Sequence, residues 1–189
     1  AGLTEQEAAL HLLNRFTFGP KPGQVEEVVQ QGLENWFLAQ LQPVPDNEVV
    51  RNRLTGLQAL NMPTDSIVNT YVQPAQLIRL AIKNGFIDKD SVDRTDKPAY
   101  RDAIKKMQSD YGYRPLQELQ RELINQKVIR AIYSDAQLQE VLTDFWFNHF
   151  NVSLTKNQIQ QLVLPYERDA IRPNVLNSFS SLLFATAKH

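Results

Sequence analysis

Apolar residues recur at the three- and four-residue spacing of an α-helix along most of this chain, and no stretch of strand length alternates apolar with polar residues. The longest helical run begins after Pro115 and includes Leu119, Leu123, Val128 and Ile132. A chain that is helical throughout must bury the apolar stripe of each helix against other helices. The sequence therefore predicts an all-α protein, an orthogonal or irregular bundle of about eight to ten helices.

Capping and helix-breaking residues mark the predicted helix boundaries. Thr4 and Glu7 have the spacing of a capping box, in which each side chain bonds the backbone of the other residue. Gly32 is placed to end the second predicted helix, and Asp46 to cap the fourth. Pro74 fits the first turn of a later helix, because the N–H that proline lacks is not needed there.

Charge and composition exclude several classes of function. The 189 residues include 20 basic and 21 acidic side chains, so we expect no concentrated basic face for nucleic acid or for an anionic membrane. The absence of cysteine excludes disulfides, thiolate metal sites and cysteine nucleophiles. No apolar run approaches the roughly 20 residues that span a bilayer, and no transmembrane segment is predicted.

The chain is long enough to bury its own core, and we expect one helical module over residues 1–189. Residues 85–113 differ from the rest, because charged side chains crowd a short stretch with little apolar content. These charged residues are Asp88, Lys89, Asp90, Asp93, Arg94, Asp96 and Lys97. The composition predicts an exposed charged insertion within residues 85–113.

His149 lies in the segment that carries most information about a site, residues 137–153. At about 100° per residue, a helix places His149 on an apolar face with Leu138, Val141, Leu142 and Phe145. An imidazole enclosed by such a face more often bonds a carbonyl or carboxylate and holds the packing. The alternative is a general acid or base or a single metal ligand, because a neutral imidazole suits both roles.

The other candidate site residues are Asn148, Arg15 and His11. Asn148 belongs to a polar face that is interpreted as solvated: Glu140, Asp144, Asn148 and Asn151. His11 and Arg15 are four residues apart on the first predicted helix and can point together into a cleft, although a surface pair is the commoner arrangement. With three histidines and no cysteine, the sequence assigns no metal ligand and no cofactor-binding residue, and the cofactor is unknown.

Three motifs follow one another along almost the whole chain. The first is His-Leu-Leu-Asn-Arg-Phe-Thr-Phe-Gly-Pro at residues 11–20, and the second is Phe-Trp-Phe-Asn-His-Phe-Asn-Val-Ser at residues 145–153. The third starts at Arg172 and ends with Ala-Lys-His at residues 187–189. Together they resemble a large bacterial family of uncharacterised proteins, the domain of unknown function 1800 family. Phe147 stands where many members of that family have His, which argues against a paired-histidine ligand set.

The resemblance implies a bacterial protein and, because family members commonly carry export signals, a periplasmic or extracellular location. Members are usually much longer, which implies that this chain is the N-terminal part of a longer protein. Its partner is then the C-terminal remainder of the same protein, where the family has an acidic, Arg-containing helix.

The last predicted helix of this chain also favours self-association, unless the module covers its apolar residues, Phe179, Leu182, Leu183 and Phe184.

Two functions remain open, and the sequence does not decide whether the chain is an enzyme. The first is a helical scaffold or interaction module of an exported bacterial protein, with His149 enclosed and no cleft beside it. The alternative is the N-terminal half of a hydrolase or lyase that acts on an extracellular polymer. In that case His149, Asn148 and Arg15 form one wall of the site, and the acidic catalytic part lies outside this chain. An open, solvent-connected pocket lined by His149 and Arg15 would argue heavily against the first function, the scaffold or interaction module.

Overall fold

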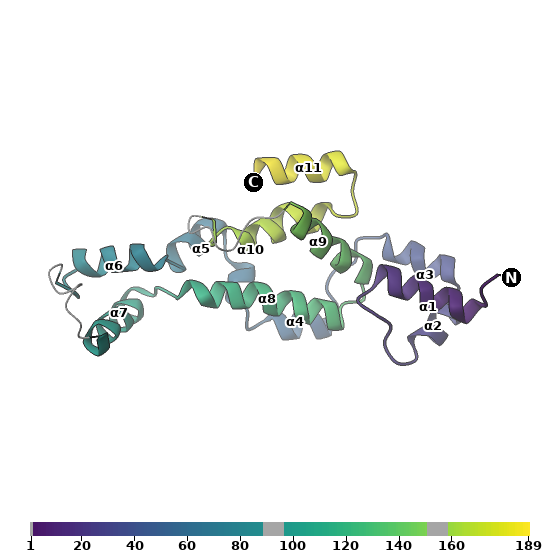
Figure 1. The fold of residues 1–189 in the computed structure, drawn as a ribbon, viewed down its shortest axis with the longest axis horizontal. Helices are drawn as coiled ribbons and strands as arrows, with labels where there is room; N and C mark the ends of the chain where they lie inside the picture. Colours follow the sequence, from purple (N-terminus) through teal and green to yellow (C-terminus); the bar gives the residue numbers. More distant parts are fainter. Residues whose placement is uncertain (1, 89–96, 151–158) are drawn as a thin grey trace. The chain divides into compact units, whose positions relative to one another are not determined.

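The computed structural model describes residues 2–88, 97–150 and 159–189, which form eleven α-helices and no strand (Figure 1). The predicted all-α fold class is therefore confirmed. Contacts group the chain into two compact units, and we describe each by itself. Unit 1 comprises residues 1–57, 124–152 and 165–189, and unit 2 comprises residues 58–123 and 153–164. The single module expected from the sequence stays a prediction.

Unit 1 contains helices from both ends of the sequence. They are α1 (Glu5–Phe16), α2 (Gln24–Gln31), α3 (Leu33–Gln40), α4 (Glu48–Leu54), α9 (Gln137–His149) and α11 (Phe179–Lys188). The second half of α8 (Leu116–Tyr133) also belongs to this unit. A π-helical segment, η3 (Tyr166–Ile171), and a 3-10 turn, η4 (Arg172–Asn174), precede α11.

The first core of unit 1 is formed by α1, α2 and α3 around Leu13, which is fully buried. Ala9, Val28 and Trp36 pack with it. The predicted capping box at the start of α1 is confirmed, and Gly32 ends α2 with a positive φ of 87°. The positive φ explains why glycine occupies this position, since other residues adopt it at a cost.

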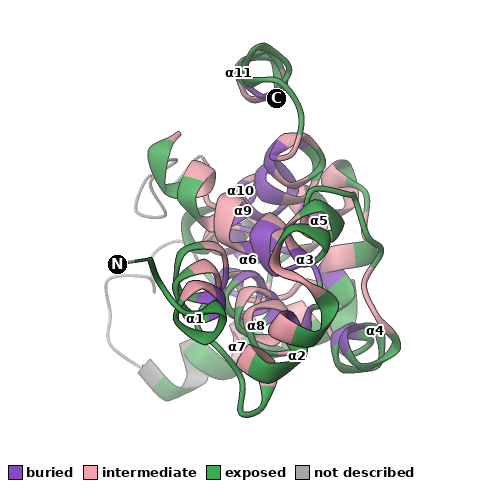
Figure 2. Cartoon of the chain, turned by 90° about the vertical axis from the view of Figure 1, so that its right-hand side faces the viewer, coloured by how far each residue is buried: buried purple, intermediate pink, exposed green. Residues whose placement is uncertain are grey.

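The second core of unit 1 lies between α9 and the segment that contains η3 and η4. Its buried residues are Tyr166, Ala170, Ile171 and Val175, and Leu142, Trp146, Phe147 and Phe150 pack against them. On α11, only Leu182 is buried, and most of the helix surface is exposed (Figure 2).

One predicted cap is wrong by a single residue. The side chain of Asn47, not Asp46, accepts a hydrogen bond of 2.9 Å from the backbone N–H of Val50 and caps α4. Asp46 instead pairs with Arg130, at 2.9 Å. Both residue types cap helices well, so the local sequence alone does not distinguish them.

Unit 2 contains η1 (Gln58–Asn61), α5 (Thr64–Thr70), α6 (Pro74–Lys83), α7 (Lys97–Tyr111) and the first half of α8. The short helix α10 (Val163–Pro165) begins in this unit. Met107 and Ile87 are buried in its core with Val72, Leu77 and Ala81. These two residues belong to the stretch predicted as a charged insertion, so that part of it contributes apolar packing. Residues 89–96 of the same stretch lie outside the described residues.

A polar network is enclosed in unit 2 around Tyr71, which is fully buried. The Tyr71 hydroxyl donates to Glu122 at 3.2 Å and accepts from Arg114 at 2.8 Å. Glu122 also accepts a hydrogen bond of 2.7 Å from the backbone N–H of Ala59. Burial, and then the charge of Glu122, raise the pKa of Tyr71 to about 12, although Arg114 opposes this shift.

The pKa of Tyr71 should fall when the charge of Glu122 is removed. In the Glu122→Gln variant we expect Tyr71 to ionise below about 12, as measured by NMR of the tyrosine ring across alkaline pH. Because the native pKa is raised, the contribution of this phenol to stability is present below its ordinary pKa of 10 and is lost as pH rises through about 12. Glu118→Gln is the control and should shift the pKa less. An unchanged midpoint in Glu122→Gln would contradict the expected charge effect.

No helix in the described part of the chain combines the length and the apolar composition needed to cross a bilayer.

Candidate functional site

An open depression of about 590 Å³ lies between the C-terminal end of α1, the turn after it and α9. We call it the His149 depression. Its lining residues are Asn14, Arg15, Thr17, Phe18, Val141, Asp144, Phe145, Asn148 and His149. Three of the four candidate residues from the sequence, Arg15, Asn148 and His149, therefore meet at one place. His11 is exposed on α1 but does not line this depression.

His149 is exposed, and the prediction of an enclosed imidazole is wrong. Its ring is stacked on the ring of Phe145, one helical turn earlier. The ring centroids are 6.0 Å apart, and the angle between the ring planes is 16°. The imidazole also forms edge-to-face pairs with the rings of Trp146 and Phe150, at centroid distances of 5.4 Å and 5.2 Å. The helix period correctly places Phe145 and His149 on one face with Leu138 and Leu142, but only the N-terminal part of that face is covered, and Phe145 and His149 are exposed.

The turn after α1 is fixed by local hydrogen bonds and brings Phe18 to the edge of the depression. The Thr17 hydroxyl donates to the carbonyl of Leu13 at 2.7 Å and accepts from the N–H of Gly19 at 3.0 Å. The backbone N–H of Phe18 donates to the side chain of Gln137 at 3.4 Å, which joins this turn to the start of α9. These contacts hold Arg15 and His149 on facing elements.

A second, more enclosed pocket of about 200 Å³ lies beside the depression. We call it the Lys127 pocket. Its lining residues are Phe18, Lys127, Val128, Ala131, Glu140, Thr143, Asp144 and Arg172. Phe18 and Asp144 line both cavities, so the two form one continuous surface of unit 1.

Arg172, which lines the Lys127 pocket, lies between two buried carboxylates. Its Nη1 atom donates to both carboxylate oxygens of Glu140, at 2.7 and 2.8 Å, and its Nη2 atom donates to Glu167 at 3.1 Å. Glu140 is 5% exposed and Glu167 is 1% exposed. The interpretation of Glu140 as part of a solvated face is therefore wrong. The segment that contains η3 and η4 covers this side of α9 and supplies the matching charge.

Lys127 joins the buried pair to the open depression. Its Nζ atom lies 3.2 Å from Glu167 and 3.0 Å from Asp144, and it also lies 3.9 Å from the centre of the Phe147 ring. Asp144 accepts a second hydrogen bond, of 3.2 Å, from Asn148. Asp144 thus connects the ion pairs of the pocket to the side chains around His149.

The network continues along α8 to Asp46, the residue before the cap of α4. Gln126 donates to Glu167 at 2.7 Å and accepts from Arg130, which pairs with Asp46. Among the described residues of this network, four carboxylates face three cations: Asp46, Glu140, Asp144 and Glu167 against Lys127, Arg130 and Arg172. One negative charge is left in excess.

Burial and pairing act in opposite directions on these groups. Burial raises the pKa of Glu140, and Arg172 partly opposes that shift. Burial lowers the pKa of Arg172, but Glu140 and then Glu167 raise it, and the net direction is upward. Arg172 therefore stays charged and supplies the positive charge on which the two buried carboxylates depend.

The π-helical segment η3 provides the geometry of this pair. Glu167 is the second residue of η3, and Arg172 follows five residues later, directly after its end. In a π-helix the repeating hydrogen bond spans five residues, so residues at that spacing lie close together. π-helical turns are rare and are often found at functional sites. Opposite charges five residues apart, Glu167 and Arg172, were the sequence signal of this site, and helical periodicity did not detect it.

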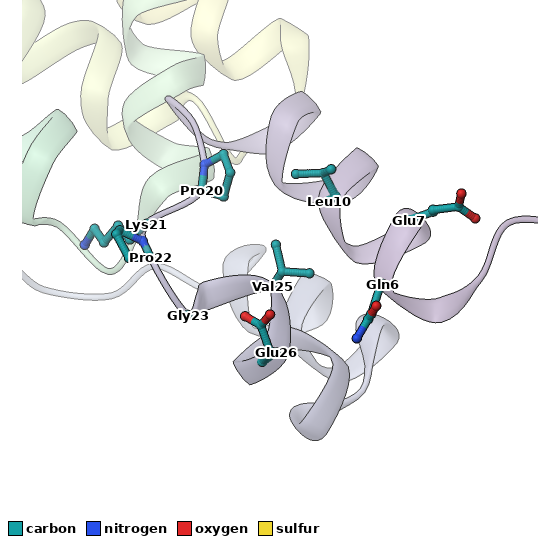
Figure 3. A pocket seen from close by; sticks show the side chains of 9 residues that line it. All are labelled: Gln6, Glu7, Leu10, Pro20, Lys21, Pro22, Gly23, Val25 and Glu26. Carbon is teal, nitrogen blue, oxygen red and sulfur yellow. The ribbon is translucent and has the colours of Figure 1, made fainter.

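A third depression, of about 530 Å³, lies between α1 and α2 (Figure 3). Leu10, Pro20 and Val25 provide most of its apolar lining, and Glu7 at its edge takes part in the capping box of α1. Its side chains do not form a charged or hydrogen-bonded group comparable to that around Asp144.

The chemistry open to the site comes from imidazole, guanidinium, ammonium and carboxylate groups. In the described part of the chain, no group of three or more His, Asp or Glu residues is arranged to hold a metal ion.

The model of a protein family described as "Protein of unknown function (DUF1800)" matches residues 11–189. The chain therefore belongs to this family, as its three motifs indicated. No curated protein and no solved structure matches the chain.

Proposed function

We propose that this member of the DUF1800 family is a helical interaction module of an exported bacterial protein, and that the His149 depression is its contact surface. The observation that supports this proposal is the meeting of exposed Arg15, Asn148 and His149 at one open depression. The form of this function that the sequence predicted, with His149 enclosed and no cleft beside it, is wrong. The exposed imidazole favours a surface that contacts another molecule.

The composition of the depression supports a contact surface. Phe18 and Phe145 are large exposed apolar residues, and they lie beside the polar groups of Arg15 and His149. Aromatic residues and arginine are enriched at protein interfaces and supply much of their binding energy. The open shape suits a protruding partner better than a small enclosed ligand.

The proposed partner is the C-terminal remainder of the same protein, and the proposed location is the periplasm or the cell exterior. Both follow from what the family resemblance implies. Fractionation of the native host tests the location directly, and a cytoplasmic protein would contradict it.

Self-association through α11 is a second proposed mode of contact, since its exposed face carries Phe179, Leu183 and Phe184.

The alternative is one wall of a hydrolase or lyase site for an extracellular polymer. The same depression favours it, because the imidazole of His149 and the carboxylate of Asp144 are groups that transfer protons. The guanidinium of Arg15 can stabilise negative charge that develops on a substrate. The second wall then comes from the acidic part that the family resemblance implies outside this chain.

Substitution of His149 or Arg15 should weaken binding of the C-terminal remainder. With the two parts produced separately and titrated by calorimetry, His149→Ala and Arg15→Glu should each raise the dissociation constant at least about tenfold, equivalent to about 1.4 kcal/mol. His11→Ala is the matched control, because His11 lies one turn before Arg15 on α1 but outside the depression. Equal affinities for all these variants would reject the contact surface.

The full-length protein separates the two functions. His149→Gln should abolish turnover of a polymer if the alternative holds, because glutamine cannot transfer the proton. If activity against polymers and metal content are unchanged by this substitution, the enzyme alternative is rejected, and the binding experiment still tests the interaction module.

A further inference from the structure

The two permanent charges that line the His149 depression differ in whether they are paired. Both oxygens of Asp144 are engaged, because Oδ1 lies 3.0 Å from the ammonium of Lys127 and Oδ2 accepts a hydrogen bond of 3.2 Å from Asn148. Arg15 is exposed and makes no ion pair and no side-chain hydrogen bond with any described residue. The depression therefore presents a paired carboxylate and an unpaired guanidinium.

We propose that the His149 depression binds a carboxylate of its partner, the side chain of an Asp or Glu that stands next to an apolar residue, and that Arg15 recognises it. The inference rests on the proposed function, because it names the chemistry of the partner that this contact surface takes.

The unused hydrogen-bond donors of the depression match an anionic acceptor. A guanidinium has five N–H donors and no acceptor, and its planar fork fits the two oxygens of a carboxylate. Asp144 does not occupy these donors, since it is held by Lys127 and Asn148. The imidazole of His149, which has no hydrogen bond to a described residue, adds one N–H donor in its neutral form. A basic ligand would meet the unpaired charge of Arg15 with the same sign.

The surroundings of Arg15 within unit 1 do not engage its donors. Arg15 lies in the last turn of α1, where a positive charge interacts favourably with the carbonyl end of the helix. That interaction requires only a charge and occupies none of the N–H groups. The buried carboxylates Glu140 and Glu167 do not line the depression, and they are held by Arg172 and Lys127.

Exposed aromatic rings beside Arg15 define what must accompany the carboxylate. Phe18 and Phe145 are 51% and 55% exposed, and both line the depression. A partner that covers them removes apolar surface from water, and it also excludes water from the guanidinium, which strengthens a hydrogen bond between charged groups. The ligand is therefore an acidic residue with an apolar neighbour. A free inorganic anion would leave both rings exposed.

NMR with small probes tests recognition of this chemical group. Phenylpropionate carries a carboxylate beside an apolar ring and should shift the Nε–H signal of Arg15 and the backbone signals of Phe18 and Asn148. Phenylpropionamide has nearly the same shape without the charge and should not. Arg15→Gln should abolish the response, and Lys21→Gln, which removes a cation outside the depression, should leave it unchanged. Equal responses to the two probes would overturn the inference.

Salt dependence tests the same contact with the C-terminal remainder. Between about 0.05 M and about 0.5 M NaCl, screening should raise the dissociation constant at least about threefold more for the unmodified chain than for Arg15→Gln. Lys21→Gln is again the control and should behave like the unmodified chain. Equal salt dependence of the unmodified chain and Arg15→Gln would overturn the inference.

The carboxylate site and the proposed contact surface fail separately. Binding of the remainder that is lost in His149→Ala but has the same salt dependence with and without Arg15 would support the contact surface and reject the carboxylate. If the remainder does not bind at all, the contact surface is rejected, and the response to phenylpropionate still decides whether the depression takes a carboxylate.

Discussion

Replacement of Arg172 by methionine is expected to lower the free energy of unfolding of unit 1 by about 3–5 kcal/mol. The change removes one partner of a buried ion pair and leaves the carboxylates of Glu140 and Glu167 without their main positive charge. Removal of one partner costs far more than a surface charge, because the remaining charges cannot be solvated. Urea denaturation, monitored by tryptophan fluorescence, measures this free energy of unfolding. Both tryptophans, Trp36 and Trp146, belong to unit 1.

Arg15→Met is the matched control for this experiment. It makes the same chemical change at an exposed arginine of the same unit, and its effect should stay within about 0.5 kcal/mol. If the two substitutions cost the same, Arg172 is not an essential partner of the buried carboxylates.

The free energy of unfolding that the Arg172→Met variant loses should also depend on pH. Burial raises the pKa of Glu140 above its ordinary value of 4.5, and the loss of Arg172 removes the main opposing effect. A raised carboxyl pKa means that the native state binds the proton more tightly than the unfolded state, so stability is present below pH 4.5 and is lost as pH rises through the native pKa. The variant should therefore be closest to the unmodified protein below pH 4.5. A deficit that widens as pH falls would contradict this sign.

Leu13→Ala is expected to lower the free energy of unfolding by about 3 kcal/mol, the usual range for a large-to-small change in a core. Leu13 is fully buried between α1, α2 and α3, and the substitution removes its contacts with Val28 and Trp36 and leaves a cavity. Leu10→Ala makes the same change three residues earlier on α1, where the side chain is 42% exposed, and should cost less than about 1 kcal/mol. Chemical denaturation of the two variants side by side measures the difference. Equal losses would mean that the buried face of α1 is not the one described.

The fold could be predicted from the sequence because its signals are local. The capping box of Thr4 and Glu7, the glycine at position 32 and the proline that starts α6 each depend on a few neighbouring residues. The grouping of residues into two units depends instead on contacts between distant segments. Such contacts left no periodic signal in the chain.

The candidate site could be predicted only in part. The sequence suggested Arg15, Asn148 and His149, and the structure brings these together because the turn after α1 is tied to α9 through Gln137. It misassigned Glu140 and His149 on α9, because a helical period shows which residues share a face but not which part of a face is covered. Glu140 is covered by a segment that begins more than 20 residues later in the sequence, and its partner Arg172 is 32 residues away.

The π-helical segment has a consequence for how this chain can tolerate changes in its length. A π turn closes its hydrogen bond over five residues where an α turn uses four, so η3 contains one residue more than an α-helical path would need. Deletion of one residue between Glu167 and Arg172 can therefore close the segment to an α turn without rotating the chain that follows. Glu167 and Arg172 would then be four residues apart, a spacing that still places two side chains side by side on a helix. The regular helix α9 has no such extra residue, and a deletion between Glu140 and Asp144 would rotate everything after it by about 100°.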